Sequence, residues 1–168
     1  ELDENPWKTR GLSARELVSQ LARAKAQALA ERHPEALILG ADQVVDLDGE
    51  ILGKPGSRTG AIAQLERLAG RSHDLVTGLA LLHAGSGRYS SAVDVHRMTL
   101  RSRTRSQIGN YVGRDSPEQC AGSYRIESLG ISLFESLEGR DYSAIIGLPL
   151  TVVTRLLAEA GLDPLGSV

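Results

Sequence analysis

The stretch Ala36-Leu-Ile-Leu-Gly-Ala41, followed directly by Asp42 and Gln43, decides the fold of this chain. A continuous apolar run of this length is typical of a strand that is buried on both faces, and it continues through Asp42 and Gln43 to Val45. The dipeptide Asp48-Gly49 then predicts a tight hairpin. Strand ends that face a cleft are where α/β domains bind ligands, so Asp42 is the first candidate for a functional side chain.

Helices and further strands are predicted on both sides of this stretch. Ser13-Ala-Arg-Glu16 is a capping box, which predicts a helix that begins after Ser13 and ends at Pro34. A second helix is predicted from about Thr59 to Leu68, and Thr104 with Gln107 caps a third. The other expected elements are strands over 72–83 and 88–101, a strand through Ile131, Leu133 and Leu137, and a last helix after Pro149 that buries Leu150, Val153 and Leu157. This order predicts an α/β or α+β domain in which helices pack on a mixed sheet.

The composition limits the possible partners and compartments. A chain of 168 residues fits a single domain. Its net charge of -2 and its pI near 6.1 give no basic field for a nucleic-acid polymer. The longest apolar runs, such as Leu75–Leu82, are too short to span a membrane. Cys120 is the single cysteine, so no internal disulfide framework is possible, and we expect a reducing, cytoplasmic compartment.

Asp42 is the most informative position for chemistry. An ionised carboxylate beside a buried strand is costly unless a metal, a cation or hydrogen bonds compensate it. The structural alternative is a carboxylate that accepts hydrogen bonds from nearby backbone N–H groups.

Four further positions could contact a ligand. In Gly53-Lys54-Pro55 the glycine allows close backbone approach and the lysine can meet a phosphate as a point charge, although the full P-loop spacing is absent. Lys25 borders the apolar face of the first helix, where most lysines only extend to solvent. Glu4 ends an acidic cluster that begins at Glu1, and such clusters are usually solvated. Glu127 lies near the centre of the glycine-bounded segment 122–130, which could instead be an ordinary connection.

Other enzyme classes find little support in the sequence. The four histidines lack the spacing of a zinc site, and one cysteine cannot help to build a thiolate cage. No Gly-x-Ser-x-Gly nucleophile motif is present. Cys120 is better interpreted as a small core residue than as a nucleophile.

Taken together and in this order, these segments resemble the Maf-like nucleotide pyrophosphatases over essentially the whole chain. The resemblance rests on 1–4, 21–26, 40–43, 48–55, 77–78, 122–130 and 147–150. Four details resemble the subgroup that acts on 7-methyl-GTP, namely Gln43, the run Cys120-Ala-Gly-Ser, Glu127 and 137–141.

The resemblance implies an ITPase-like α/β fold with a central nucleotide cleft, often dimeric. It implies hydrolysis of a nucleoside triphosphate between the α and β phosphates, with a divalent metal, Mg or Mn, as cofactor. Asp42 matches the catalytic acid-base carboxylate, and it would also hold the metal, together with Glu4. Glu4, Lys25 and Lys54 match polar cleft residues, while Gln43 and Glu127 match positions linked to base selection. Whether Asp42 acts chiefly as base or as metal ligand stays open.

The resemblance has one departure and leaves two alternatives. The family begins with a strand and a Ser-x-Ser-Pro-x-Arg loop that would precede Glu1, so we expect the native product to extend upstream. The other explanation is a degenerate protein that has lost this loop. The first alternative is a dTTP and UTP pyrophosphatase of the same family, against which Gln43 and Glu127 argue. The second is a non-catalytic, nucleotide-binding regulator of cell division.

Overall fold

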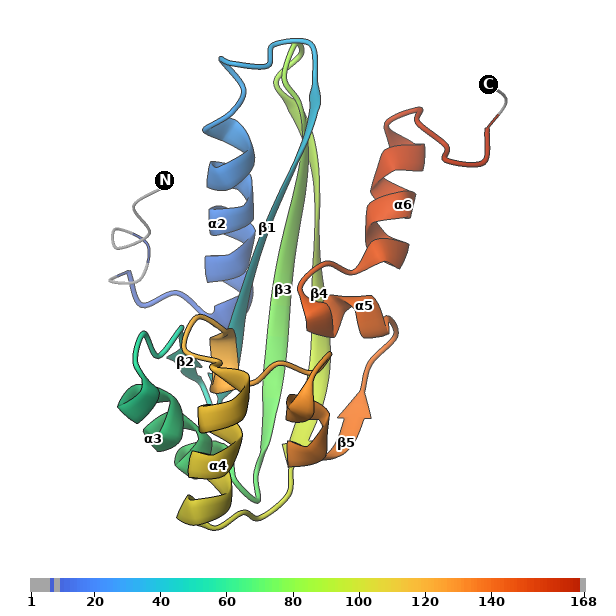
Figure 1. Ribbon diagram of the computed structural model, residues 1–168. Helices are drawn as coiled ribbons and strands as arrows, with labels where there is room; N and C mark the ends of the chain where they lie inside the picture. The colour runs from blue at the N-terminus through green and yellow to red at the C-terminus, as the bar shows by residue number, and fades with distance from the viewer. Residues whose placement is uncertain (1–6, 8–9, 167–168) are drawn as a thin grey trace. The chain divides into compact units, whose positions relative to one another are not determined.

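A sheet flanked by helices forms the protein, as the computed structural model shows for Trp7 and residues 10–166 (Figure 1). The five strands follow the order β2-β1-β3-β4-β5, and the pairs β1–β2 and β4–β5 are antiparallel. The predicted α/β class is therefore confirmed. The strands are β1 (Leu37–Leu47), β2 (Glu50–Leu52), β3 (Ser72–His83), β4 (Arg88–Leu100) and β5 (Phe134–Glu138). The helices are α2 (Ala14–Gln27), α3 (Arg58–Leu68), α4 (Arg105–Asp115), α5 (Tyr142–Ile146) and α6 (Leu150–Glu159), with 3-10 turns η1 (Ala121–Ser123) and η2 (Leu129–Leu133).

The chain divides into two compact units that share the long strands. Unit 1 comprises Glu1–Gln43, Thr77–Asp94 and Asp141–Val168, and unit 2 comprises Val44–Val76 and Val95–Arg140. Among the described residues, no helix combines the length and the apolar character that a membrane span requires.

In unit 1, helices pack on both faces of the strands (Figure 1). Helix α2 comes so close to β1 that a Cβ atom on Gly40 would lie 2.1 Å from the carbonyl oxygen of Ala22. Gly78 of β3 approaches α2 similarly, since a Cβ atom on Gly78 would lie 2.5 Å from the backbone of Val18. The other face is packed by α6, in a cluster that includes Leu79, Leu81, Val153 and Leu156. Because side chains alternate along a strand, successive residues of β1 point in turn toward α2 and toward α6.

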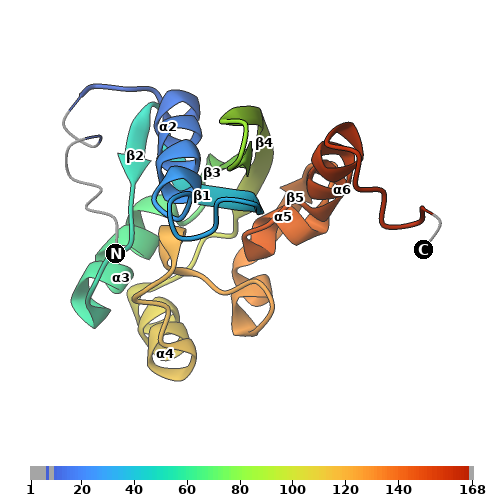
Figure 2. The same cartoon turned by 90° about the horizontal axis from the view of Figure 1, so that it is seen from above.

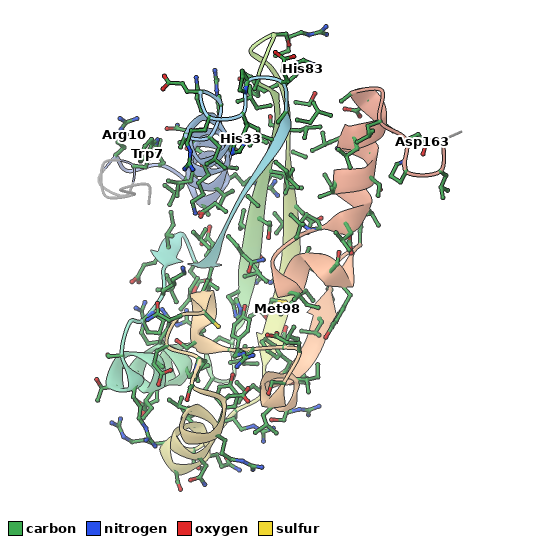
Figure 3. All side chains as sticks on the ribbon, turned by 45° about the horizontal axis from the view of Figure 1, so that its top comes forward. Trp7, Arg10, His33, His83, Met98 and Asp163 are labelled. Atoms are coloured by element: carbon green, nitrogen blue, oxygen red, sulfur yellow. The ribbon has the colours of Figure 1, made fainter. Side chains whose placement is uncertain are left out.

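In unit 2, α3 and α4 lie side by side, and η1 packs on α3 (Figure 2). Met98, labelled in Figure 3, is fully buried. His73 is buried as well, and its Nε2 lies 3.0 Å from the hydroxyl of Tyr124, which packs edge-on against Phe134. Burial lowers the pKa of His73 to about 4, so the imidazole is neutral at pH 7.

Two boundaries and one buried position differ from the sequence prediction. Helix α2 ends at Gln27, well before Pro34, because its last buried residue is Ala26 and the chain then continues in exposed turns. Ile131 lies in η2 rather than in a strand, and β5 begins only at Phe134. In α6, Leu156 is buried in place of Leu150, which is 52% exposed.

A short helix that the sequence pattern did not predict, α5, is capped by a single carboxylate. Asp141 accepts hydrogen bonds from the backbone and hydroxyl of Ser143 at 2.9 and 2.5 Å. It also accepts from the backbone and hydroxyl of Thr151 in α6, at 2.7 and 2.8 Å. These bonds, first that from the Ser143 hydroxyl and next that from the Thr151 backbone, lower the pKa of Asp141 to about 2. One ionised side chain therefore fixes the starts of two helices.

Replacing Asp141 with asparagine should remove a pH-dependent part of the stability. Because the pKa of Asp141 falls from 3.8 to about 2 on folding, its ionised form stabilises the protein above about pH 4, and this stabilisation is lost as the pH falls toward 2. Urea unfolding of both proteins across this range should show the variant less stable at pH 7 and the difference shrinking below pH 4. Thr151→Val, which removes only one of the four donors, should show a smaller difference of the same sign. A difference that stays constant down to pH 2 would contradict this role of Asp141.

Candidate functional site

Lys25 and Asp42 form the chemically most distinctive pair in unit 1. The Nζ atom of Lys25 lies 2.5 Å from Oδ1 of Asp42, and the exposed side-chain fractions are 33% and 10%. This burial costs more for the carboxylate than for the lysine, and the ion pair compensates it. The sequence left a metal, a cation or hydrogen bonds as possible compensation for the charge of Asp42, and the structure shows a cation, Lys25.

The local sequence explains why these two side chains meet. The capping box at Ser13 and Glu16 fixes the start of α2, and Gly40 lets the helix backbone approach β1. Asp42 follows Gly40 by two positions on the same strand, so it projects toward the same face as Gly40, the face that α2 covers. Lys25, in the last turn of α2, borders the buried side of the helix as its spacing predicts.

Gln43 projects from the opposite face of β1. Its Nε2 donates to the hydroxyl of Thr77 at 2.8 Å and to the carbonyl oxygen of Ala144 at 2.7 Å. Both amide hydrogens of Gln43 thus bind other parts of unit 1, and its Oε1 is the atom left to accept a hydrogen bond.

In unit 2, Lys54 lies in an exposed loop that follows β2. Gln64 of α3 donates to the carbonyl oxygen of Gly53 at 3.0 Å, and its Oε1 accepts from the hydroxyl of Ser123 at 2.5 Å. A single side chain therefore ties the loop of Lys54 to the segment that begins at Cys120.

The charges of this region act on one thiol. Burial raises the pKa of Cys120, and Arg125, Glu127 and Lys54 then act on it through their charges in that order, with the two cations lowering the pKa and Glu127 raising it.

Glu127 occupies a tight turn in the same unit. The turn is closed by a hydrogen bond from the backbone N–H of Ser128 to the carbonyl oxygen of Arg125, at 3.2 Å. Ile126 is buried, whereas the side chain of Glu127 is 44% exposed. Nε of Arg125 lies 3.4 Å from Oε1 of Glu127. The turn thus presents a carboxylate to solvent with a guanidinium beside it.

Comparison with protein families identifies the family of the chain. The sequence profile of the Maf-like protein family matches residues 1–160. The chain belongs to the Maf-like family. Members of this family are generally nucleoside triphosphate pyrophosphatases that depend on a divalent metal.

Asp42 of this Maf-like protein is an oxygen donor of the kind that a hard divalent cation binds. Within the described part of the chain, no three His, Cys, Asp or Glu residues gather into a metal cluster. Mg²⁺ does not require one, because it is usually bound by one or two carboxylates together with substrate phosphates. Asp42 provides such a carboxylate. Glu4, the second predicted ligand, lies outside the described residues.

The structure therefore pairs Lys25 with Asp42 in unit 1 and places Lys54 and Glu127 in unit 2 of this Maf-like protein. Sequence reasoning missed the residues that support these positions, which are Gln64, Tyr111 and Asp115. Tyr111 and Asp115 follow at i, i+4 on one face of α4. Their donors, the backbone N–H of Arg125 and the hydroxyl of Ser128, are fourteen and thirteen positions away in the sequence.

Proposed function

We propose that this protein hydrolyses a nucleoside triphosphate, 7-methyl-GTP, to the nucleoside monophosphate and pyrophosphate. The observation that carries the proposal is the Lys25–Asp42 pair, with its carboxylate 10% exposed, in a chain that matches the Maf-like family over residues 1–160. The proposal includes a homodimer that acts in the cytoplasm.

The chemistry requires a positioned water and neutralisation of charge. Water attacks the α phosphorus in line with the departing pyrophosphate, so catalysis is mostly positioning and electrostatics. Asp42 orients the water or accepts its proton. Lys25 and Lys54 neutralise the charge that develops on the pyrophosphate.

A divalent cation, Mg or Mn, belongs to this proposal as cofactor. Asp42 would hold it, with Glu4 as the second carboxylate. When bound, the cation supplies neutralisation of the phosphate oxygens.

Glu127 is the proposed contact for the base. Methylation at N7 makes guanine cationic and its N1–H more acidic, so a carboxylate can accept from N1–H and the exocyclic amine together. Pyrimidines do not offer this pair of donors. Since Arg125 lies beside Glu127, a cationic base would also compete with Arg125 for the carboxylate.

A panel of nucleotides tests the reaction. The protein is incubated with Mg²⁺ or Mn²⁺ and with 7-methyl-GTP, GTP, dTTP or UTP, and both pyrophosphate and monophosphate are measured. The proposal predicts equal amounts of the two products, formed fastest from 7-methyl-GTP. Fastest release from dTTP and UTP would instead identify a pyrimidine-specific enzyme. Tight nucleotide binding without product would identify a non-catalytic regulator, and either result would refute the proposal.

Glu127→Gln should lower kcat/KM for 7-methyl-GTP about ten- to a hundredfold and leave UTP hydrolysis similar or improved. The reason is that hydrogen bonds to a charged group contribute roughly 1.5–3 kcal/mol, and a site built around them rejects analogues that lack the donors. Steady-state kinetics on both nucleotides measure the ratio.

A control variant and a double-mutant comparison complete this test of Glu127. Glu135→Gln removes an exposed carboxylate from β5 of the same unit and should leave the ratio unchanged. Changes at Gln43 and Glu127 should be non-additive if both residues contact the base. An equal loss on every triphosphate in Glu127→Gln would show that this residue only shapes its loop.

A further inference from the structure

Helix α4 holds both ends of the turn that carries Glu127. At one end, the backbone N–H of Arg125 donates to the hydroxyl of Tyr111 at 2.9 Å. At the other end, the hydroxyl of Ser128 donates to Oδ1 of Asp115 at 2.7 Å. Tyr111 and Asp115 are one helical turn apart, so a single rigid face of α4 provides both attachments.

The two attachments are buried and linked to each other. Tyr111 and Asp115 are 5% and 6% exposed. Burial raises the pKa of Tyr111 most, the bond from Arg125 opposes this rise, and the charge of Asp115 adds to it. The phenol therefore stays protonated, and Asp115 lies close enough to act on it.

The turn has little freedom between these attachments. Ile126 is 3% exposed and anchors the turn in the core. A Cβ atom on Gly130 would lie 2.2 Å from the carbonyl oxygen of Arg125, so the chain that leaves the turn passes directly over its start. Glu127 therefore carries a partly exposed carboxylate on a turn that is fixed at both ends.

We propose that Tyr111 and Asp115 are positioning residues that fix the direction of Glu127 and thereby set the base preference of the enzyme. This inference rests on the proposed function. A carboxylate that must accept two hydrogen bonds from one face of a base needs a fixed direction, because misalignment weakens both bonds.

Ser128→Ala tests the inference, and because it leaves the buried Asp115 without this donor, circular dichroism first checks that the variant is folded. It removes the donor to Asp115 and should lower the ratio of kcat/KM for 7-methyl-GTP over UTP about tenfold, mainly through KM for 7-methyl-GTP. Ser128→Thr retains a hydroxyl and should restore the ratio. Asp115→Asn retains an acceptor, so its ratio should lie between those of Ser128→Ala and Ser128→Thr. A loss that is the same for both nucleotides would overturn the inference.

A double-mutant cycle tests whether the effect passes through Glu127. In the Glu127→Gln background, Ser128→Ala should change the ratio no further, because the carboxylate being positioned is gone. An equal tenfold effect in both backgrounds would overturn the inference.

Amide hydrogen exchange separates this inference from the proposed function. Exchange at residues 126–128 should be faster in Ser128→Ala and in Tyr111→Phe than in the parent protein, whichever nucleotide is hydrolysed. If the parent hydrolyses no triphosphate, the proposed function fails, and equilibrium binding of 7-methyl-GTP and UTP gives the ratio instead. Unchanged exchange in both variants would overturn the positioning role even in an active enzyme.

Discussion

Replacing Asp42 with asparagine should lower turnover of the preferred triphosphate on the order of 10²–10⁴-fold, the usual scale for losing an acid-base group. The substitution retains the shape and one acceptor oxygen but removes the charge needed to activate water or to bind a cation. Stability should change little, because the introduced amide can still accept a hydrogen bond from Lys25, whose side chain is 33% exposed and can be hydrated. Product release in saturating Mg²⁺ and thermal unfolding measure the two effects.

Asp46→Asn is the matched control for Asp42. Asp46 lies on the same strand, and its carboxylate accepts a hydrogen bond from the backbone N–H of Gly49 at 2.7 Å. The same chemical change there should leave turnover close to that of the parent protein. A stable Asp42→Asn variant with near-normal turnover would remove the support for the proposed mechanism.

The Lys25–Asp42 pair suggests a second explanation for a loss of turnover in Asp42→Asn, and kinetics can distinguish it from a direct role of Asp42. If Asp42 served only to hold Lys25 in place, then Lys25→Gln, Asp42→Asn and the double variant would all lose the same activity. If Asp42 acts on water or on a cation, the Asp42→Asn loss should exceed that of Lys25→Gln, and its size should depend on the metal concentration.

Local signals in the sequence predicted the elements that local interactions stabilise. The capping boxes at Ser13 and Thr104 begin α2 and α4 as expected, because each box satisfies backbone donors of its own first turn. The strand over 72–83 also matched its predicted range. By contrast, α5 was missed because its five residues are too few to show a helical period in the sequence.

The candidate site likewise combines features that the sequence predicted with features that it did not. The spacing of Lys25 along its helix and the position of Asp42 after an apolar run were visible in the sequence, and the structure brings these two residues together. The support of Glu127 by α4 was not visible, because Ser128 and Asp115 are thirteen positions apart. The roles of Lys54, Gln43 and Glu127 toward a nucleotide stay predictions that the kinetic tests address.

Gly40→Ala should destabilise the protein by about 3 kcal/mol, at the upper end of the usual cost of overpacking. The added Cβ would lie 2.1 Å from the carbonyl oxygen of Ala22 and 2.8 Å from the backbone nitrogen of Ala26. Both contacts are with the backbone of α2, so no side-chain rotation relieves them and the helix itself must move. Urea unfolding at pH 7 measures the loss.

The same displacement should weaken the site, because Lys25 is carried by the helix that moves. We therefore expect Gly40→Ala to lower turnover even under conditions in which the variant is fully folded. Gly109→Ala is the matched control: it adds the same methyl group to α4, where no neighbouring atom lies within 4 Å. It should stabilise the protein by up to about 1 kcal/mol, since alanine is the better helix former, and leave turnover unchanged. A Gly40→Ala protein as stable and as active as the parent would show that close contact between α2 and β1 is not what holds Lys25 against Asp42.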